Sequence, residues 1–215
     1  MAISSNIYDL INTEIDNRDL EWEKAFLNAL PSAHLGILND TPQTGPDGWP
    51  YLMVKIDENG SQSAYEVISW LSDKGIGLAI NPQKEAPDFV LSYGMIWNFR
   101  QRKEFLSTFN SGQPGQIKFE AGEKVLAGAP SDDYLPDYAR AVLRAFLNEN
   151  KIVDPKILVI SKDQKNFDLC FSLESIGSPD VSEHKGLLEA LSWFLPPHYS
   201  LVVASEKGLP AFHTL

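Results

Sequence analysis

Residues 122–161 read GEKVLAGAPSDDYLPDYARAVLRAFLNENKIVDPKILVIS, and this stretch decides how the second half of the chain folds. A short strand flanked by glycines is predicted at residues 125–127. Pro136 then stands where a helix accepts a residue that has no N–H. An apolar stripe at four-residue spacing follows, formed by Tyr138, Val142 and Phe146. Residues 156–160 (KILVI) have the composition of a buried strand, so the stretch predicts strand, helix and strand in succession.

The chain beyond this stretch predicts a hairpin, a second helix and a last strand. Residues 162–165 form a turn, and the residues after it alternate strictly. One face of that strand carries Phe167, Leu169, Phe171 and Leu173, and the other carries Asp168, Cys170, Ser172 and Glu174. We expect one of these faces to meet a core. Asp180 and Glu183 resemble a capping box before a helix that ends at Pro196-Pro197, and a strand is predicted at residues 199–204.

The order of these elements is strand, helix, strand, strand, helix, strand. It is typical of a split-βαβ, ferredoxin-like sandwich with its helices on one face of the sheet. The N-terminal half predicts two helices, a strand at 51–56, a helix at 61–75, and strands at 76–80 and 88–92. The last of these is expected to continue past a bulge at Gly94 to Phe99.

A segment dense in small and turn residues, NSGQPG at 110–115, separates the two patterned regions. We therefore expect an α+β protein made of two small α/β-sandwich domains, residues 1–112 and 116–215. A length of 215 residues is sufficient for two such cores.

The charge balance argues against nucleic acid and anionic membranes as partners. The chain has 29 acidic and 18 basic residues, a net charge of -11, and both halves are acidic. Binding to a phosphate backbone needs lysines and arginines that release counterions, and an acidic chain favours a basic partner instead. There is one cysteine, the N-terminus resembles no signal peptide, and no apolar run has the length of a membrane span. These features predict a cytoplasmic protein.

No motif in the chain indicates a particular chemistry. The four histidines lie far apart in the sequence, and none has a second ligand at a spacing typical of zinc or iron sites. Nucleophile elbows, P-loops and zinc-protease motifs are missing, and Gly75-Ile76-Gly77 lacks the third glycine of a dinucleotide fingerprint. Cys170 lies between Asp168 and Glu174, an unfavourable setting for a thiolate, so a structural role is expected for it. We predict no catalytic residue, no metal and no cofactor.

The second half resembles the C-terminal domain of the SseB-like proteins, bacterial two-domain proteins named for enhanced serine sensitivity. The resemblance is carried by the short strand ending in a turn with Gly128 and Pro130, the helix begun at Pro136, the strand KILVIS, and the hairpin, helix and strand that follow. It covers roughly the last hundred residues. It implies a cytosolic protein without a known catalytic site that acts through binding, and it assigns no functional residue.

Two functional hypotheses follow. The first is a non-enzymatic binding or regulatory protein that acts through protein–protein interaction or self-association. The alternative is a small-molecule sensor or enzyme whose site lies in the cleft between the two halves. The segment WNFRQRK at 97–103 concentrates basic and aromatic side chains, which suit an anion or an acidic peptide. The candidate ligand-binding residues of this alternative are Trp49, Tyr93, Trp97, Arg100 and Arg102.

Overall fold

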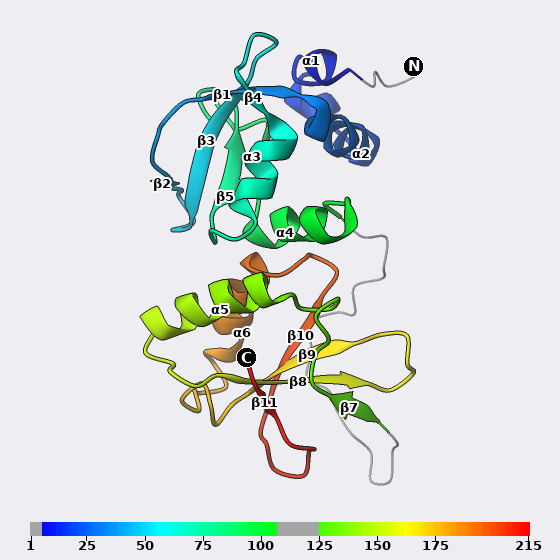
Figure 1. The fold of residues 1–215 in the computed structure, drawn as a ribbon, viewed down its shortest axis with the longest axis vertical. Helices are drawn as coiled ribbons and strands as arrows, with labels where there is room; N and C mark the ends of the chain where they lie inside the picture. The colour runs from blue at the N-terminus through cyan, green and yellow to red at the C-terminus, as the bar shows by residue number, and fades with distance from the viewer. Residues whose placement is uncertain (1–5, 107–124) are drawn as a thin grey trace. The chain divides into compact units, whose positions relative to one another are not determined.

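The computed structural model describes residues 6–106 and 125–215, which belong to two compact units, Met1–Phe105 and Leu106–Leu215. Each unit contains helices and a mixed β-sheet (Figure 1), so the predicted α+β class with two units is confirmed. The predicted boundary segment 110–115 lies outside the described residues, as does a short strand that the sequence also predicts at residues 117–119. The two units are described separately below.

The sheet of the first unit has the strand order β4-β1-β3-β5-β6, with β2 paired to the outer part of β3. Its strands are β1 (His34–Ile37), β2 (Gln43–Thr44), β3 (Pro50–Ile56), β4 (Gln62–Ser63), β5 (Gly77–Ile80) and β6 (Phe89–Leu91). β3 and β5 are parallel and the other pairs are antiparallel. The parallel pair requires a crossover, and the helix α3 (Ala64–Leu71) supplies it.

The helices α1, α2 and α4 of the first unit begin after a residue whose side chain accepts a hydrogen bond from a free amide group. They are α1 (Ile7–Leu10), α2 (Leu20–Ala29), α3 and α4 (Tyr93–Arg102), with 3-10 turns at η1 (Ile15–Asn17) and η2 (Leu30–Ser32). Asp19 accepts hydrogen bonds from the amides of Glu21 and Trp22 at the start of α2. The helix expected at 61–75 is observed in its central part as α3, and Gly75 has the predicted left-handed conformation with a φ of 69°.

The strand predicted to run from residue 88 to Phe99 is wrong in its second part. The strand β6 ends at Leu91, and the helix α4 begins at Tyr93 because the Ser92 hydroxyl accepts a hydrogen bond from the Met95 amide. The apolar residues at 93, 95, 97 and 99 fit an extended period of two, and those at 93, 96 and 97 fit a helical period. The capping residue Ser92 decides in favour of the helix, whereas the sequence-based prediction places Ser92 within a strand.

The second unit has the sheet order β10-β9-β8-β11, with β7 also paired to β8. Its elements are β7 (Leu126–Gly128), α5 (Asp137–Glu149), β8 (Lys156–Ser161), β9 (Asp168–Ser172), α6 (His184–Trp193), β10 (Ser200–Ala204) and β11 (His213–Thr214). The predicted order of elements along the chain is confirmed, and β11 is an addition at its end. The ring of Phe146 in α5 lies 4.6 Å from that of Phe194 at the end of α6, so the two helices are neighbours.

The arrangement of these strands in space differs from a ferredoxin-like sheet. A split-βαβ arrangement would place β7 between the parallel strands β9 and β10. Instead, β9 and β10 pair directly, and β7 pairs with the other edge of β8 at Val159, Ile160 and Ser161. The strands β7, β8 and β9 are therefore adjacent and antiparallel, and β9, α6 and β10 form an unsplit βαβ unit.

The strand β9 is buried on both faces, where the sequence predicted one. Cys170 pairs with Leu158 on one side and with Val202 on the other, and this row of side chains belongs to a core that also contains Phe212. The next row, formed by Leu169, Val159 and Leu201, faces the opposite way and is largely buried too. The segment after β10 brings Leu209 and Phe212 onto the first face. The residues that cover this face lie far from β9 in the sequence, so the alternating pattern within β9 does not predict that the face is buried.

None of the described helices combines the length and the apolar character that crossing a membrane requires.

Candidate functional site

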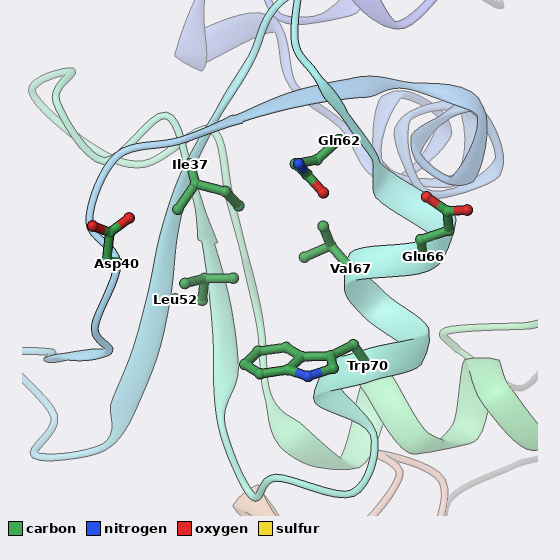
Figure 2. Close-up of a pocket in the computed structure, with 7 residues that line it drawn as sticks. All are labelled: Ile37, Asp40, Leu52, Gln62, Glu66, Val67 and Trp70. Atoms are coloured by element: carbon green, nitrogen blue, oxygen red, sulfur yellow. The ribbon is translucent and has the colours of Figure 1, made fainter.

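A groove of about 400 Å³ lies in the first unit, between α3 and the strands β1, β3 and β4 (Figure 2). We call it the α3 groove. It is lined by Ile37, Asp40, Leu52, Gln62, Glu66, Val67 and Trp70. These residues come from four separate elements and one loop, so the site exists only in the folded unit.

The helix α3 supplies three of the lining residues, Glu66, Val67 and Trp70. Trp70 is an apolar residue that lies outside the buried stripe of this helix. The buried positions are Ala64, Val67, Ile68 and Leu71. Trp70 falls beside this stripe and its side chain is 54% exposed. Glu66 precedes Trp70 by four residues, which places both on the same side of the helix. The sequence contains a signal for this site, because Trp70 does not share the apolar period of the buried residues of α3. Trp70 was not among the predicted site residues.

The strands contribute the apolar surface of the groove. Leu35 and Ile37 point to the same face of the sheet, but Leu35 is fully buried whereas Ile37 is 37% exposed. The edge strand β4 pairs with His34 and Leu35 and does not extend to Ile37. Beyond the end of β4, the side chain of Ile37 faces the groove together with Leu52 of β3.

The charges that line the groove are both negative. Figure 2 shows Asp40 and Glu66 at opposite ends, with Ile37, Leu52 and Val67 between them. Among the residues that the structure describes, neither carboxylate forms an ion pair. The Nζ atom of Lys74 lies 5.6 Å from the centroid of the Trp70 ring, within the range of a cation–π contact. The groove thus combines an apolar floor, an exposed indole and two unneutralised carboxylates.

Three of the residues expected to form a ligand site lie on one helix of the first unit. Tyr93, Trp97 and Arg100 lie on α4 at steps of four and three residues, and both aromatic side chains are fully buried. The Tyr93 hydroxyl donates to the Ser72 carbonyl at 2.7 Å, and Arg100 donates to the Ser72 hydroxyl at 2.8 Å. Arg102 is exposed at the end of the helix. Trp49 belongs to the turn before β3, where its amide donates to Asp47.

The basic residue that follows these arginines also has a partner inside its own unit. Lys103 ends α4 in a left-handed conformation and donates to the Tyr65 hydroxyl at 2.9 Å. This hydrogen bond lowers the pKa of Tyr65. Of the basic side chains in the segment 97–103, Arg100 and Lys103 therefore bind groups of the first unit.

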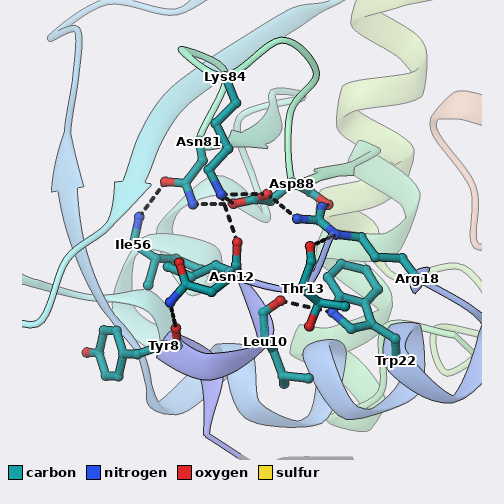
Figure 3. Close-up of polar contacts among 11 residues, drawn as sticks. Tyr8, Leu10, Asn12, Thr13, Arg18, Trp22, Ile56, Asn81, Lys84 and Asp88 are labelled. Atoms are coloured by element: carbon teal, nitrogen blue, oxygen red, sulfur yellow. Dashed lines mark hydrogen bonds and ion pairs between the residues drawn. The ribbon is translucent and has the colours of Figure 1, made fainter. Parts of the chain in front are cut away.

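A second polar cluster surrounds Asp88, at the loop before β6 (Figure 3). The Asp88 carboxylate accepts hydrogen bonds from Arg18 and from Lys84, each at 2.7 Å, and from the Asn81 side chain. Burial acts to raise the pKa of Asp88, but the hydrogen bonds from Lys84, Asn81 and Arg18 outweigh it and hold that pKa below its usual value. The carboxylate is fully engaged by these donors.

The donors around Asp88 also bind backbone groups of distant segments. Lys84 donates to the Ile11 carbonyl at 2.9 Å, and the Nε atom of Arg18 donates to the Thr13 carbonyl at 3.0 Å. Asn81 has a φ of 51° and accepts a hydrogen bond from the Ile56 amide. Because Asp88, Arg18, Lys84 and Asn81 all form hydrogen bonds within the first unit, we conclude that the Asp88 cluster stabilises the fold of this unit.

The other candidate chemical groups are also structural. Cys170 is fully buried, and burial together with the nearby Asp168 raises the pKa of its thiol to about 12. Within residues 6–106 and 125–215, no group of three or more histidine, cysteine, aspartate or glutamate residues could hold a metal ion. The α3 groove is therefore the strongest candidate for a site that acts on another molecule.

Comparison with protein-family models, with curated proteins and with solved structures finds no match for the chain. The resemblance to the SseB-like proteins consequently stays a prediction.

Proposed function

We propose that this chain is a non-enzymatic binding protein that acts through protein–protein interaction, and that the α3 groove is its contact site for a basic partner. The observation that carries the proposal is the exposed indole of Trp70 beside two carboxylates that have no ion-pair partner within residues 6–106 and 125–215. Tryptophan is among the residues that contribute most to binding energy at protein interfaces. Trp70 is 54% exposed and lines the groove together with Ile37, which is 37% exposed, so the two present neighbouring apolar surface of the kind found at interaction sites.

The charge of the chain supports a basic partner. The net charge of -11 attracts cationic proteins over several ångströms, and the lining charges of the groove have the same sign. Complementary charges raise the rate of association and reject acidic competitors. A basic partner is therefore favoured both at long range and in the groove.

The competing hypothesis of a small-molecule site has less support. Its residues include Tyr93 and Trp97, whose rings have no exposed surface to offer a ligand. Arg100 binds the Ser72 hydroxyl, which reduces its availability for an anion. The α3 groove, by contrast, presents aromatic, apolar and charged groups on one surface.

Site-specific photocrosslinking tests the proposal. We would replace Gln62, which lines the groove, with the photoreactive amino acid benzoylphenylalanine and irradiate the source cells. Val153, which is 82% exposed in the second unit, is the matched control position. We expect a discrete crosslinked protein from position 62 that disappears when Trp70→Ser is added and that position 153 does not capture. That protein would then be purified and its binding to the chain measured.

The proposal fails if position 62 captures no protein, or if positions 62 and 153 capture the same proteins. Retained crosslinking in the Trp70→Ser variant would also argue against the groove, because its main contact surface would then be dispensable.

A further inference from the structure

We infer that the α3 groove recognises a lysine or arginine side chain of the partner protein, with the cation on the Trp70 ring between Asp40 and Glu66. The inference rests on the proposed function and specifies the residue type that the groove selects. Three observations carry it: the surroundings of the indole ring, the positions of the two carboxylates, and the apolar surface between them.

The Trp70 ring accepts a cation within the chain itself. The Nζ atom of Lys74 lies 5.6 Å from the ring centroid. Lys74 reaches the indole from beyond the C-terminal end of α3, whereas Glu66 and Val67 lie one turn toward its N-terminus. Figure 2 shows the indole extending across one side of the groove, below Leu52 and Val67. In the inferred complex, the cation of the partner lies against the part of the Trp70 ring that lines the groove.

Within the part of the chain that the structure describes, the two carboxylates have no counter-charge. Asp40 and Glu66 lie at opposite ends of the groove, and neither is paired with a cation among the described residues (Figure 2). A cation that enters between them interacts favourably with both, and an anion is repelled by both. This arrangement selects the sign of the ligand charge.

The apolar floor distinguishes an alkyl-ammonium or guanidinium side chain from a metal ion. Ile37, Leu52 and Val67 lie between the carboxylates and offer contacts to methylene groups. Lysine and arginine side chains carry such methylene groups behind their charge. Calcium, in contrast, requires six or more oxygen ligands, and the groove has no such set.

Two synthetic peptides test the inference. The first is acetyl-Gly-Leu-Lys-Leu-Gly-amide, and the second has norleucine in place of lysine, which keeps the alkyl chain and removes the charge. Binding would be followed by the indole N–H resonances of the ¹⁵N-labelled full chain. We expect the lysine peptide to bind with a Kd of about 1 mM, about three- to fivefold more tightly than the norleucine peptide.

Substitutions in the groove should change this preference in a defined way. Trp70→Leu keeps an apolar side chain and should remove most of the three- to fivefold preference. Glu66→Gln and Asp40→Asn should each weaken the lysine peptide by about 1.5-fold and leave the norleucine peptide unchanged. Trp49→Leu and Glu58→Gln are the matched controls outside the groove, and they should have no effect.

Four outcomes would overturn the inference. They are equal binding of the two peptides, absence of binding by either, an unchanged preference in Trp70→Leu, and equally tight binding of free n-pentylamine, which would indicate a small-amine site. Failure here leaves the photocrosslinking result intact, so a groove that binds partners without selecting a cation is distinguishable from a groove that binds no protein.

Discussion

Arg18 and Asp88 form an ion pair that joins segments 70 positions apart, with the Nη2 atom of Arg18 2.7 Å from Oδ1 of Asp88. The Asp88 side chain is 1% exposed and that of Arg18 is 11% exposed. The guanidinium also lies 4.7 Å from the centroid of the Trp22 ring, in the first turn of α2. The pair therefore attaches the segment before α2 to the loop before β6.

Replacement of Asp88 by asparagine should destabilise the first unit by about 3 kcal/mol. The change leaves the charges of Arg18 and Lys84 without their shared carboxylate, and removal of one member of a buried pair is costly. Urea unfolding followed by tryptophan fluorescence would measure the loss. The exposed pair of Lys185 and Glu189 is the control, since Glu189→Gln should cost less than about 0.5 kcal/mol. Equal effects of the two substitutions would contradict the structural role of the cluster.

The stability of the first unit should decrease in acid through the same carboxylate. The pKa of Asp88 in the folded state lies below its value in the unfolded chain. Its contribution is therefore complete at pH values above the unfolded pKa of about 4 and is lost as the pH falls through the folded pKa. The urea midpoint should be flat from pH 7 to 5 and fall toward pH 3. The Asp88→Asn variant should show a shallower decrease over this range, and parallel curves would refute the assignment.

Cys170 should be inert in the native protein. Burial raises the pKa of its thiol to about 12, and the side chain has no exposed surface. A thiol reagent at pH 8 should modify it only as fast as the second unit opens, with immediate reaction after unfolding in urea. Cys170→Ala should cost about 1 kcal/mol, and Cys170→Ser more, because the serine hydroxyl enters an apolar core. Rapid modification of the folded chain would show that the core is open at this point.

Two glycines should respond oppositely to alanine. A Cβ atom at Gly77 would lie 2.5 Å from the Tyr51 ring and 2.8 Å from the Leu91 carbonyl oxygen, so Gly77→Ala should destabilise the first unit by about 1–3 kcal/mol. A Cβ atom at Gly186, in α6, would meet no described atom within 4 Å. Gly186→Ala should stabilise the second unit by about 0.5–1 kcal/mol. Thermal unfolding of both variants checks the contrast, and a stabilised Gly77→Ala variant would show that Tyr51 moves aside freely.

Two tryptophans of the first unit should separate stability from binding. Trp22 is buried, lies 5.0 Å from the Phe26 ring and donates to the Leu10 carbonyl at 3.0 Å. Trp22→Ala should therefore cost about 3–5 kcal/mol. Trp70 is mostly exposed, and Trp70→Ala should cost less than about 1 kcal/mol. If Trp70→Ala unfolds the unit, its effect on partner binding cannot be attributed to the groove.

Local patterns in the sequence predict most of the elements and part of their burial. The stripe formed by Tyr138, Val142 and Phe146 marks α5, and the apolar run at 156–160 marks β8, because a single period decides each of them. The residues at 93–99 fit two periods, and the prediction there was wrong from Ser92 onward. The second buried face of β9 was missed because Phe212, which covers it, lies 42 positions beyond Cys170.

The amino-acid sequence by itself determines the acidity of the chain and the approximate order of its helices and strands. These follow from side-chain charge and from contacts within a few residues. Tertiary structure alone decides that β9 pairs with β10, that Asp88 meets Arg18, and that Ile37, Glu66 and Trp70 line one groove. The physical reason is that such contacts depend on which strand edges pair and where β4 ends, and no local period encodes either.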